Sequence, residues 1–471
     1  MKIKSILKLG TLALLTAALP ACSFLDTDPQ IIPDDGYYNS EQKLIYGLAG
    51  VYGVLNSEAL YGNYYSLQIA NADDLCYFNN YNNSESRPDR YNHSAGTAAI
   101  YDTWSKLYEG IKNANRYIEA VEKTEIDPEK LSVDIGLYIA EARFLRAYYH
   151  FLLAQAWGDV PLRVKATTSP NPNDVQMAAT PQEQVLKWCA DEIEATIPDL
   201  YEPIDNTPSR VSQTVAQGIL ARVYLYMNEY SRAASLSAEV MKEFPLTARE
   251  KYRNMFVNVA TRGGESILRL NGYDQSDFIS DLYYYESPSA RPSAKLKELF
   301  TDERDVRLTL FRHTANSGQT GQAVDYDNVC MKFYCTDETT NKLDRHFDPF
   351  ILRSSEMYLI NAEANYELGN TSVAADDIKA LEARALGVDA SEVVIDLASL
   401  ELAIQNERMK ELCFEGHRLF DITRRHENLS RSRNSTSSVL FLKYPDYRFV
   451  LPIPYLEIES NPEMEQNPSS N

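Results

Sequence analysis

Two pairs of helical segments with matched small residues constrain the fold more than any other feature of this chain. Apolar residues recur with helical spacing over 213–227 and 230–244, and again over 354–368 and 371–386. In each pair an alanine of the first segment lies twelve residues before an alanine of the second. These alanines are Ala221 and Ala233, then Ala362 and Ala374. Because small residues let antiparallel helices cross closely, each pair is predicted to form a helical hairpin.

The spacing is similar to that of tetratricopeptide hairpins, in which a proline commonly ends the second helix. Pro245 follows the first pair, while Gly369 and Gly387 are expected to end the helices of the second. Two pairs alone are too few to bury a continuous face. Further helices are predicted over 40–55, 101–121, 135–157 and 180–197, and we read Trp104 and Trp157 within them as core residues. The sequence therefore predicts a mainly α fold, a tetratricopeptide-like hairpin array with long irregular segments and minor short strands.

Aromatic residues gather in two stretches without helical periodicity. Tyrosine is abundant, with 32 Tyr against 16 Phe and 3 Trp. One stretch, rich in Asn and Ser, carries Asp73, Asp74, Tyr77, Phe78, Tyr81, Arg90 and Tyr91. The other, within 246–348, carries the densest cluster, which is Tyr283, Tyr284 and Tyr285. Long loops of this kind are often functional. A packed tyrosine ladder is an equally good interpretation of the second cluster.

The segment 402–424 combines an amphipathic helix with a dense run of charges. One side of the predicted helix carries Leu402, Met409, Leu412 and Cys413. The other side carries Glu407, Arg408, Glu411 and Glu415. Arg408 and Glu411, like Glu415 and Arg418, are three residues apart, which predicts structural ion pairs along a helix that stops at Gly416. A charged catalytic cluster is the alternative interpretation.

A longer pattern runs through the same segment. It reads Glu-Arg-x-x-Glu-Leu-x-Phe-Glu-Gly-x-Arg-x-x-Asp-x-x-Arg and is matched at Glu407, Arg408, Glu411, Leu412, Phe414, Glu415, Gly416, Arg418, Asp421 and Arg424. Further landmarks are Trp157-Gly158-Asp159-Val160-Pro161-Leu162, Ala362-Glu363-Ala364 and Leu451-Pro452-Ile453-Pro454. This set resembles the signature of SusD/RagB-type outer-membrane nutrient-binding lipoproteins.

The resemblance implies a non-enzymatic receptor that captures an oligosaccharide and delivers it to a SusC-like TonB-dependent transporter. It implies one large domain over 22–471, with a helical scaffold at about 40–245 and 350–425 and an irregular ligand-binding insert at about 246–348. Such proteins bind ligand through aromatic residues in irregular segments. The expected ligand-binding residues are Asp74, Tyr77, Phe78, Tyr81, Arg90, Tyr283, Tyr284 and Tyr285. A RagB-like peptide-binding role is the alternative, because tyrosine surfaces suit peptides as well as sugars.

The N-terminus has the pattern of a secretory leader. Lys2, Lys4 and Lys8 precede an apolar run over 9–19, which is too short to span a bilayer. Leu19-Pro20-Ala21-Cys22 then resembles a bacterial lipobox, although Pro20 departs from its usual small residue. We therefore expect residues 1–21 to be a signal peptide and Cys22 to carry acyl chains. Two or three such chains hold a protein on a membrane, so we expect an outer-membrane, cell-surface lipoprotein.

Charge and motifs argue against several other functions. The formal charge of −21 becomes −24 when the three leader lysines leave, so a nucleic-acid partner is not expected. The sequence contains no H-E-x-x-H, G-x-S-x-G or G-x-x-x-x-G-K-[ST] motif, so neither an enzyme activity nor a cofactor is expected. Paired carboxylates such as Asp73 and Asp74 leave a surface glycosidase as the least favoured interpretation. His417 and Asp421 have the spacing of metal ligands but lack a third ligand nearby, so no metal site is expected.

Five cysteines remain when Cys22 is set aside, which is an odd number for an oxidising compartment. Cys189 and Cys413 lie in helical patterns and are interpreted as small buried hydrophobic residues. Cys330 and Cys335 are close enough in sequence for a local disulfide.

Overall fold

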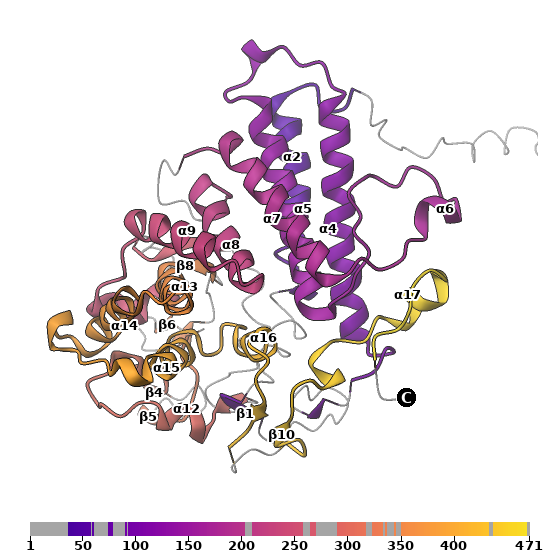
Figure 1. Ribbon diagram of the computed structural model, residues 1–471. Coiled ribbons are helices and arrows are strands. Elements are labelled where there is room, and N and C mark those ends of the chain that lie inside the picture. Colours follow the sequence, from indigo (N-terminus) through magenta and orange to yellow (C-terminus); the bar gives the residue numbers. More distant parts are fainter. Residues whose placement is uncertain are drawn as a thin grey trace, which may run out of the picture.

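The computed structural model describes residues 36–57, 59–60, 74–78, 90–91, 93–202, 210–257, 264–269, 290–316, 323–332, 335–336, 343–344, 350–432 and 437–468. Helices dominate this part of the chain and strands are short, which confirms the mainly α prediction (Figure 1). None of the helices in these ranges is long and apolar enough to cross a membrane.

The first half of the array is a bundle of four long helices. These are α2 (Glu41–Tyr52), α4 (Ala98–Glu122), α5 (Ile135–Trp157) and α7 (Gln182–Thr196), and they pack side by side around α5 (Figure 1). Trp104 and Trp157 are buried, as predicted, with their ring centroids 5.3 Å apart. The Trp157 indole N–H donates to the Pro452 carbonyl at 3.0 Å, which ties this bundle to the C-terminal segment.

The two predicted hairpins form with nearly the expected bounds. They consist of α8 (Gln213–Tyr226) with α9 (Tyr230–Glu243), and of α13 (Ser354–Glu367) with α14 (Thr371–Leu386). The four alanines of the spacing pattern are completely buried. Helix α13 packs directly against α9, although more than 100 residues separate them in the chain, and α15 (Leu400–Leu412) continues the array beyond α13 and α14. The intervening segment is therefore an insertion into a continuous helical array.

Short antiparallel ladders connect the irregular segments to this scaffold. The pairs are β1 (Cys76–Phe78) with β3 (Ala290–Pro292), β2 (Ser266–Arg269) with β8 (Phe350–Arg353), β4 (Arg312–Asn316) with β5 (Ala323–Asp327), β6 (Cys335–Thr336) with β7 (Leu343–Asp344), and β9 (Leu429–Ser430) with β10 (Phe441–Leu442). Shorter helices are α6 (Pro172–Val175), α10 (Tyr252–Val257), α12 (Ala294–Glu298), α16 (Arg418–Arg424) and α17 (Tyr455–Ser460). The β2–β8 ladder pairs residues 266–269 of the insert with the strand that directly precedes α13, where the array resumes.

Helix α15 is buried on its charged side as well as on the side that the sequence predicted. Met409 and Leu412 are buried as expected. Leu402, expected on the buried side, is 56% exposed, whereas Glu407 and Glu411 are fully buried. The helix ends at Leu412, four residues before Gly416, and Gly416 itself has φ +87°. The charges turn inward because their partners are buried side chains of other segments.

Those partners form what we call the buried ion network. Its cations are Arg307, Lys332, Arg353, Arg384 and Lys410, and its anions are Glu265, Asp305, Glu407, Glu411 and Glu415. Arg353, at the end of β8, contacts Glu411 at 2.8 Å and Glu265 at 2.6 Å. The network therefore joins the insert to α14 and α15, and its opposite charges balance within the interior.

The predicted ion pairs within the helix were wrong in their partners. Arg408 pairs with Asp421 at 2.7 Å and not with Glu411. Burial alone would raise the pKa of Glu411, but the guanidinium groups of Arg384, Arg353 and Arg307 outweigh that effect and hold it well below its usual value. The charges of the signature thus have a structural role, as the sequence indicated, but they act between elements.

Cysteine burial agrees only partly with the prediction. Cys189 and Cys413 are buried free thiols, as expected. Cys330 is also a buried free thiol, so the structure contains no disulfide between Cys330 and Cys335. Burial raises the pKa of the Cys413 thiol to about 11, which disfavours the reactive thiolate.

Candidate functional site

The β1–β3 ladder brings together the two segments from which the predicted aromatic clusters extend. Phe78 pairs with Ala290 at one end of the ladder, where the chain leaves β1 and enters β3. Tyr81 follows Phe78 by three residues, and Tyr285 precedes Ala290 by five. The ladder thus pairs the ends of the two segments, while residues 81 and 283–285 themselves lie outside the described residues.

Asp74 holds this ladder to the scaffold. Its side chain is fully buried, and its carboxylate accepts hydrogen bonds from Arg418 at 2.8 and 3.1 Å and from Lys295. Its backbone carbonyl accepts a bond from the Ser293 hydroxyl at 2.9 Å, and the Leu75 carbonyl accepts one from the Ser293 N–H at 2.7 Å. The two cations outweigh burial and lower the pKa of Asp74. Asp74 thus leaves no exposed atom for a ligand, contrary to the role expected for it.

The remaining early-segment residues have different surroundings. Tyr77 and Phe78 lie in β1, where Tyr77 pairs with Arg291 in the ladder. Arg90 is partly exposed, whereas the adjacent Tyr91 is buried beneath the guanidinium group of Arg431. The sequence did contain a signal for the contact that holds Asp74, because its partner Arg418 belongs to the charged pattern over 407–424.

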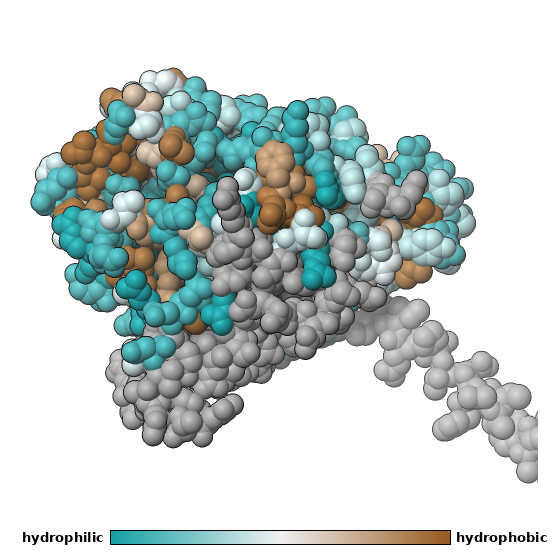
Figure 2. All heavy atoms as spheres, turned by 90° about the horizontal axis from the view of Figure 1, so that it is seen from below, coloured by the Kyte–Doolittle hydropathy of each residue, from teal (hydrophilic) through white to brown (hydrophobic). Residues whose placement is uncertain are grey.

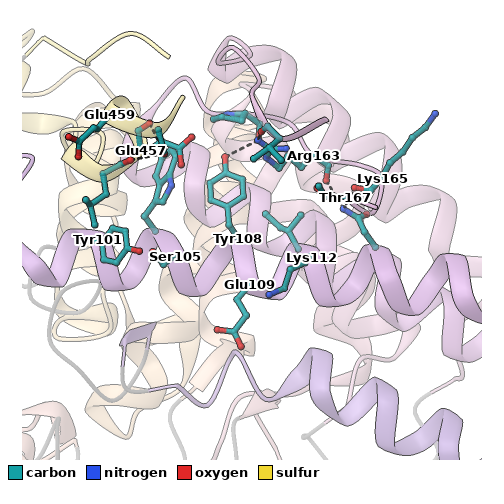
Figure 3. A pocket seen from close by; sticks show the side chains of 17 residues that line it. Tyr101, Ser105, Tyr108, Glu109, Lys112, Arg163, Lys165, Thr167, Glu457 and Glu459 are labelled. Atoms are coloured by element: carbon teal, nitrogen blue, oxygen red, sulfur yellow. Dashed lines mark hydrogen bonds between the residues drawn. The ribbon is translucent and has the colours of Figure 1, made fainter. Parts of the chain in front are cut away.

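A second candidate site is a cleft of about 710 Å³ between α4, the chain over 161–175, and α17 (Figure 3). Pockets for small ligands typically enclose about 300–1,000 Å³. Three aromatic residues of α4 form one wall, and they are Tyr101, Trp104 and Tyr108. Sequence analysis missed this cleft because helical spacing of aromatic residues predicts a core face, and Trp104 is indeed buried. The polar opposite wall is added only by tertiary structure.

Hydrogen bonds to backbone carbonyls hold the segment over 161–165 against α4. The Tyr108 hydroxyl donates to the Pro161 carbonyl at 2.8 Å, and the Asn115 amide donates to the Arg163 and Lys165 carbonyls at 3.0 and 3.2 Å (Figure 3). Burial raises the pKa of Tyr108 well above its usual value, and the Glu457 charge raises it further while that of Arg163 opposes the shift. Glu457 and Arg163 thus act on the same hydroxyl.

The end of α17 is fastened to the same segment. The Asn461 amide donates to the Met177 carbonyl at 2.9 Å, and its oxygen accepts a bond from the Met177 N–H at 3.3 Å. Gln176 donates to the Ser460 carbonyl at 3.3 Å. Hydrogen bonds within the protein therefore fix the two polar sides of the cleft, which are the chain over 161–175 and α17.

The lower end of the molecule, where Figure 1 places β1 and β10, is seen in Figure 2. Apolar surface interrupts polar surface there, and on the described chain the exposed apolar side chains of β10 and its flank include Leu440 and Phe441. Isolated exposed apolar residues are common on protein surfaces, so these two define no site by themselves.

No metal site is formed by the signature histidine. The Asp421 carboxylate pairs with Arg408 and Arg424, and burial lowers the pKa of His417 to about 4. Among the described residues there is no group of three or more potential metal-ligating side chains.

The fold defines a class of protein, a helical-repeat scaffold that carries long irregular segments. A family model described as "SusD family" matches residues 283–469, and one described as "Starch-binding associating with outer membrane" matches residues 23–225. The two matches together span most of the chain, and the chain belongs to the SusD family.

Similar proteins of known name and structure agree with this assignment. The SusD-like protein P38 of Formosa agariphila is 25% identical over 94% of this chain and 95% of its own length. A SusD superfamily protein from Bacteroides thetaiotaomicron has a TM-score of 0.78 at 21% identity, covering 91% of this chain and all of that one. A putative sugar-binding protein from Bacteroides vulgatus also has a TM-score of 0.78 at 21% identity, covering 92% of this chain and all of that one. At this identity the structures establish the fold.

Proposed function

We propose that this chain is a non-catalytic, lipid-anchored surface protein that captures an oligosaccharide and delivers it to a SusC-like TonB-dependent transporter. The observation that carries the proposal is the β1–β3 ladder, which joins the bases of the two aromatic segments. The description of the N-terminal family model, starch binding with association to the outer membrane, supports both the ligand class and the location.

The ligand platform in this proposal consists of aromatic side chains beyond the ladder. Tyr81 with Tyr283, Tyr284 and Tyr285 stack on sugar rings, Tyr77 and Phe78 form the base, and Arg90 donates hydrogen bonds to sugar hydroxyls. Stacking and the release of water contribute on the order of 1 kcal/mol per ring, so several rings give micromolar or weaker binding, which improves with oligomer length. Asp74 acts beneath the platform as a positioning residue. A peptide ligand, as in RagB-like members, is the second candidate because tyrosines suit both chemistries.

Replacing Tyr81 or Tyr284 by alanine is expected to weaken oligosaccharide binding about fivefold, which corresponds to about 1 kcal/mol, with little change in the melting temperature. A glycan array first selects the oligosaccharide, and a peptide library is screened in parallel. Calorimetric titration of each variant then measures affinity. Tyr46→Ala is the matched control, since Tyr46 is 62% exposed on α2. If both variants bind normally, or if they lose about 3 kcal/mol of stability as core truncations do, the platform assignment fails.

The anchor and the transporter are tested together in membranes. Wild-type protein is expected to stay in the outer-membrane fraction after a salt wash and to co-purify with a larger barrel protein in mild detergent. Cys22→Ala is expected to leave the membrane, because acyl chains supply its attachment. Mass spectrometry of the mature N-terminus checks the acylation directly. Retention of the Cys22→Ala variant on washed membranes contradicts the anchor, and wild-type protein that purifies alone contradicts the transporter partnership.

A further inference from the structure

We infer that the cleft between α4 and α17 is a second saccharide site, which binds one or two neutral sugar units. It shares the ligand class of the proposed function but none of its residues. Its boundaries lie wholly within described parts of the chain.

The first observation is a hydrogen-bond donor on a residue that lines the cleft, without an acceptor on the described chain. Trp104 is 3% exposed, and nothing on the described chain accepts a hydrogen bond from its indole N–H. The neighbouring indole of Trp157, by contrast, donates to Pro452. The Trp104 indole N–H is not fully enclosed. A ligand in the cleft can therefore supply its acceptor.

The second observation is an aromatic surface beside that donor. Tyr101 lines the cleft from the first turn of α4 and is 40% exposed, so its ring is open to the cleft (Figure 3). A sugar ring can lie against such a face, because its C–H groups contact the ring while its hydroxyls remain free for hydrogen bonds.

Charges of both signs surround the aromatic wall. Arg163 offers donors from one side of Tyr108, and Glu457 offers carboxylate acceptors from the other (Figure 3). Glu459 and Lys165 extend this arrangement toward the rim. Sugar hydroxyls both donate and accept, so a neutral polyol satisfies both groups. A ligand with a single charge would meet a like charge on one side, which favours neutral sugars over acidic ones.

The size of the cleft sets the length of the ligand. A volume of about 710 Å³ accommodates a small ligand, and the walls are fixed by the bonds of Asn115 and Asn461. The site therefore suits a terminal or branching unit of a glycan whose longer part occupies the platform, or a free disaccharide.

The test follows the three indole N–H signals of the chain by NMR while maltose, cellobiose or xylobiose is added to the purified protein. We expect at least one disaccharide, at roughly millimolar concentration, to shift the Trp104 signal and to leave that of Trp157 in place. The variant Trp104→Phe assigns the signal. Tyr101→Ala and Glu457→Gln are each expected to weaken this binding about fivefold, whereas the control Tyr46→Ala leaves it unchanged.

Either of two results overturns the inference: no disaccharide shifts the Trp104 signal, or both cleft variants bind as the wild type does. The platform variant Tyr284→Ala separates the two sites. It is expected to retain disaccharide binding in the cleft, so a failure of the platform and a failure of the cleft give different patterns.

Discussion

Replacing Arg353 by methionine is expected to lower the free energy of unfolding by about 3–5 kcal/mol, because it leaves buried carboxylates without their cation. Arg353 is 1% exposed and donates to Glu265, Glu411 and Glu415 at 2.6–2.8 Å. Methionine fills a similar volume but neutralises none of these charges. Urea unfolding followed by circular dichroism measures the loss.

A matched control and a milder variant keep this prediction testable. Arg304 also pairs with a carboxylate, Asp302 at 2.7 Å, but its side chain is 62% exposed. Arg304→Met is therefore expected to cost less than about 1 kcal/mol. If Arg353→Met does not fold, Arg384→Met removes a cation with fewer contacts to the same network. If the buried and the exposed variants lose the same free energy of unfolding, the buried ion network stabilises the fold no more than an exposed ion pair does.

The same network predicts an acid dependence. Burial alone would raise the pKa of Glu415, but Arg353 and Lys332 outweigh that effect and lower it to about 2, below its ordinary value of 4.5. The folded state therefore binds this proton more weakly than the unfolded state, so the stabilisation is complete above about pH 4.5 and is lost as the pH falls toward 2. In Arg353→Met this part of the acid dependence should diminish.

Replacing Arg418 by methionine is expected to cost about 2–4 kcal/mol and also to weaken oligosaccharide binding. Arg418 makes two hydrogen bonds to the buried carboxylate of Asp74, and only Lys295 remains to neutralise that charge. The loss should be smaller than for Arg353 because one cation is left. Binding suffers because Asp74 lies two residues before β1, which supports the proposed platform.

Unfolding and calorimetry on the same sample distinguish positioning from stability alone. Arg448→Met is the control, since Arg448 forms a local, partly exposed pair with Asp446 at 2.7 Å. Well below the melting temperature, Arg418→Met is folded and its affinity can be compared with the wild type. An unchanged affinity beside a large loss of stability would remove the positioning role of Asp74 and Arg418.

Local periodicity determined much of the scaffold. The spacing of Ala221 and Ala233 predicted a hairpin, and α14 begins and ends where the sequence indicated, at Thr371 and Leu386. Such predictions succeed because a helix and its nearest partner bury side chains only a few turns apart in sequence, so the pattern of apolar and small residues contains the answer.

Only tertiary structure decided that the charged side of α15 is buried as well and what Asp74 does. Glu411 finds Arg353 and Arg307 from segments 58 and 104 residues away, and Asp74 meets Arg418 across 344 residues. A helical sequence pattern predicts that a carboxylate is exposed, because the pattern does not show a cation that lies far away in the sequence and neutralises the carboxylate in the fold. The cleft beside Trp104 likewise exists only where α4, the chain over 161–175 and α17 meet. Periodicity reports local burial, whereas long-range charge pairing and the walls of a site depend on how the array packs.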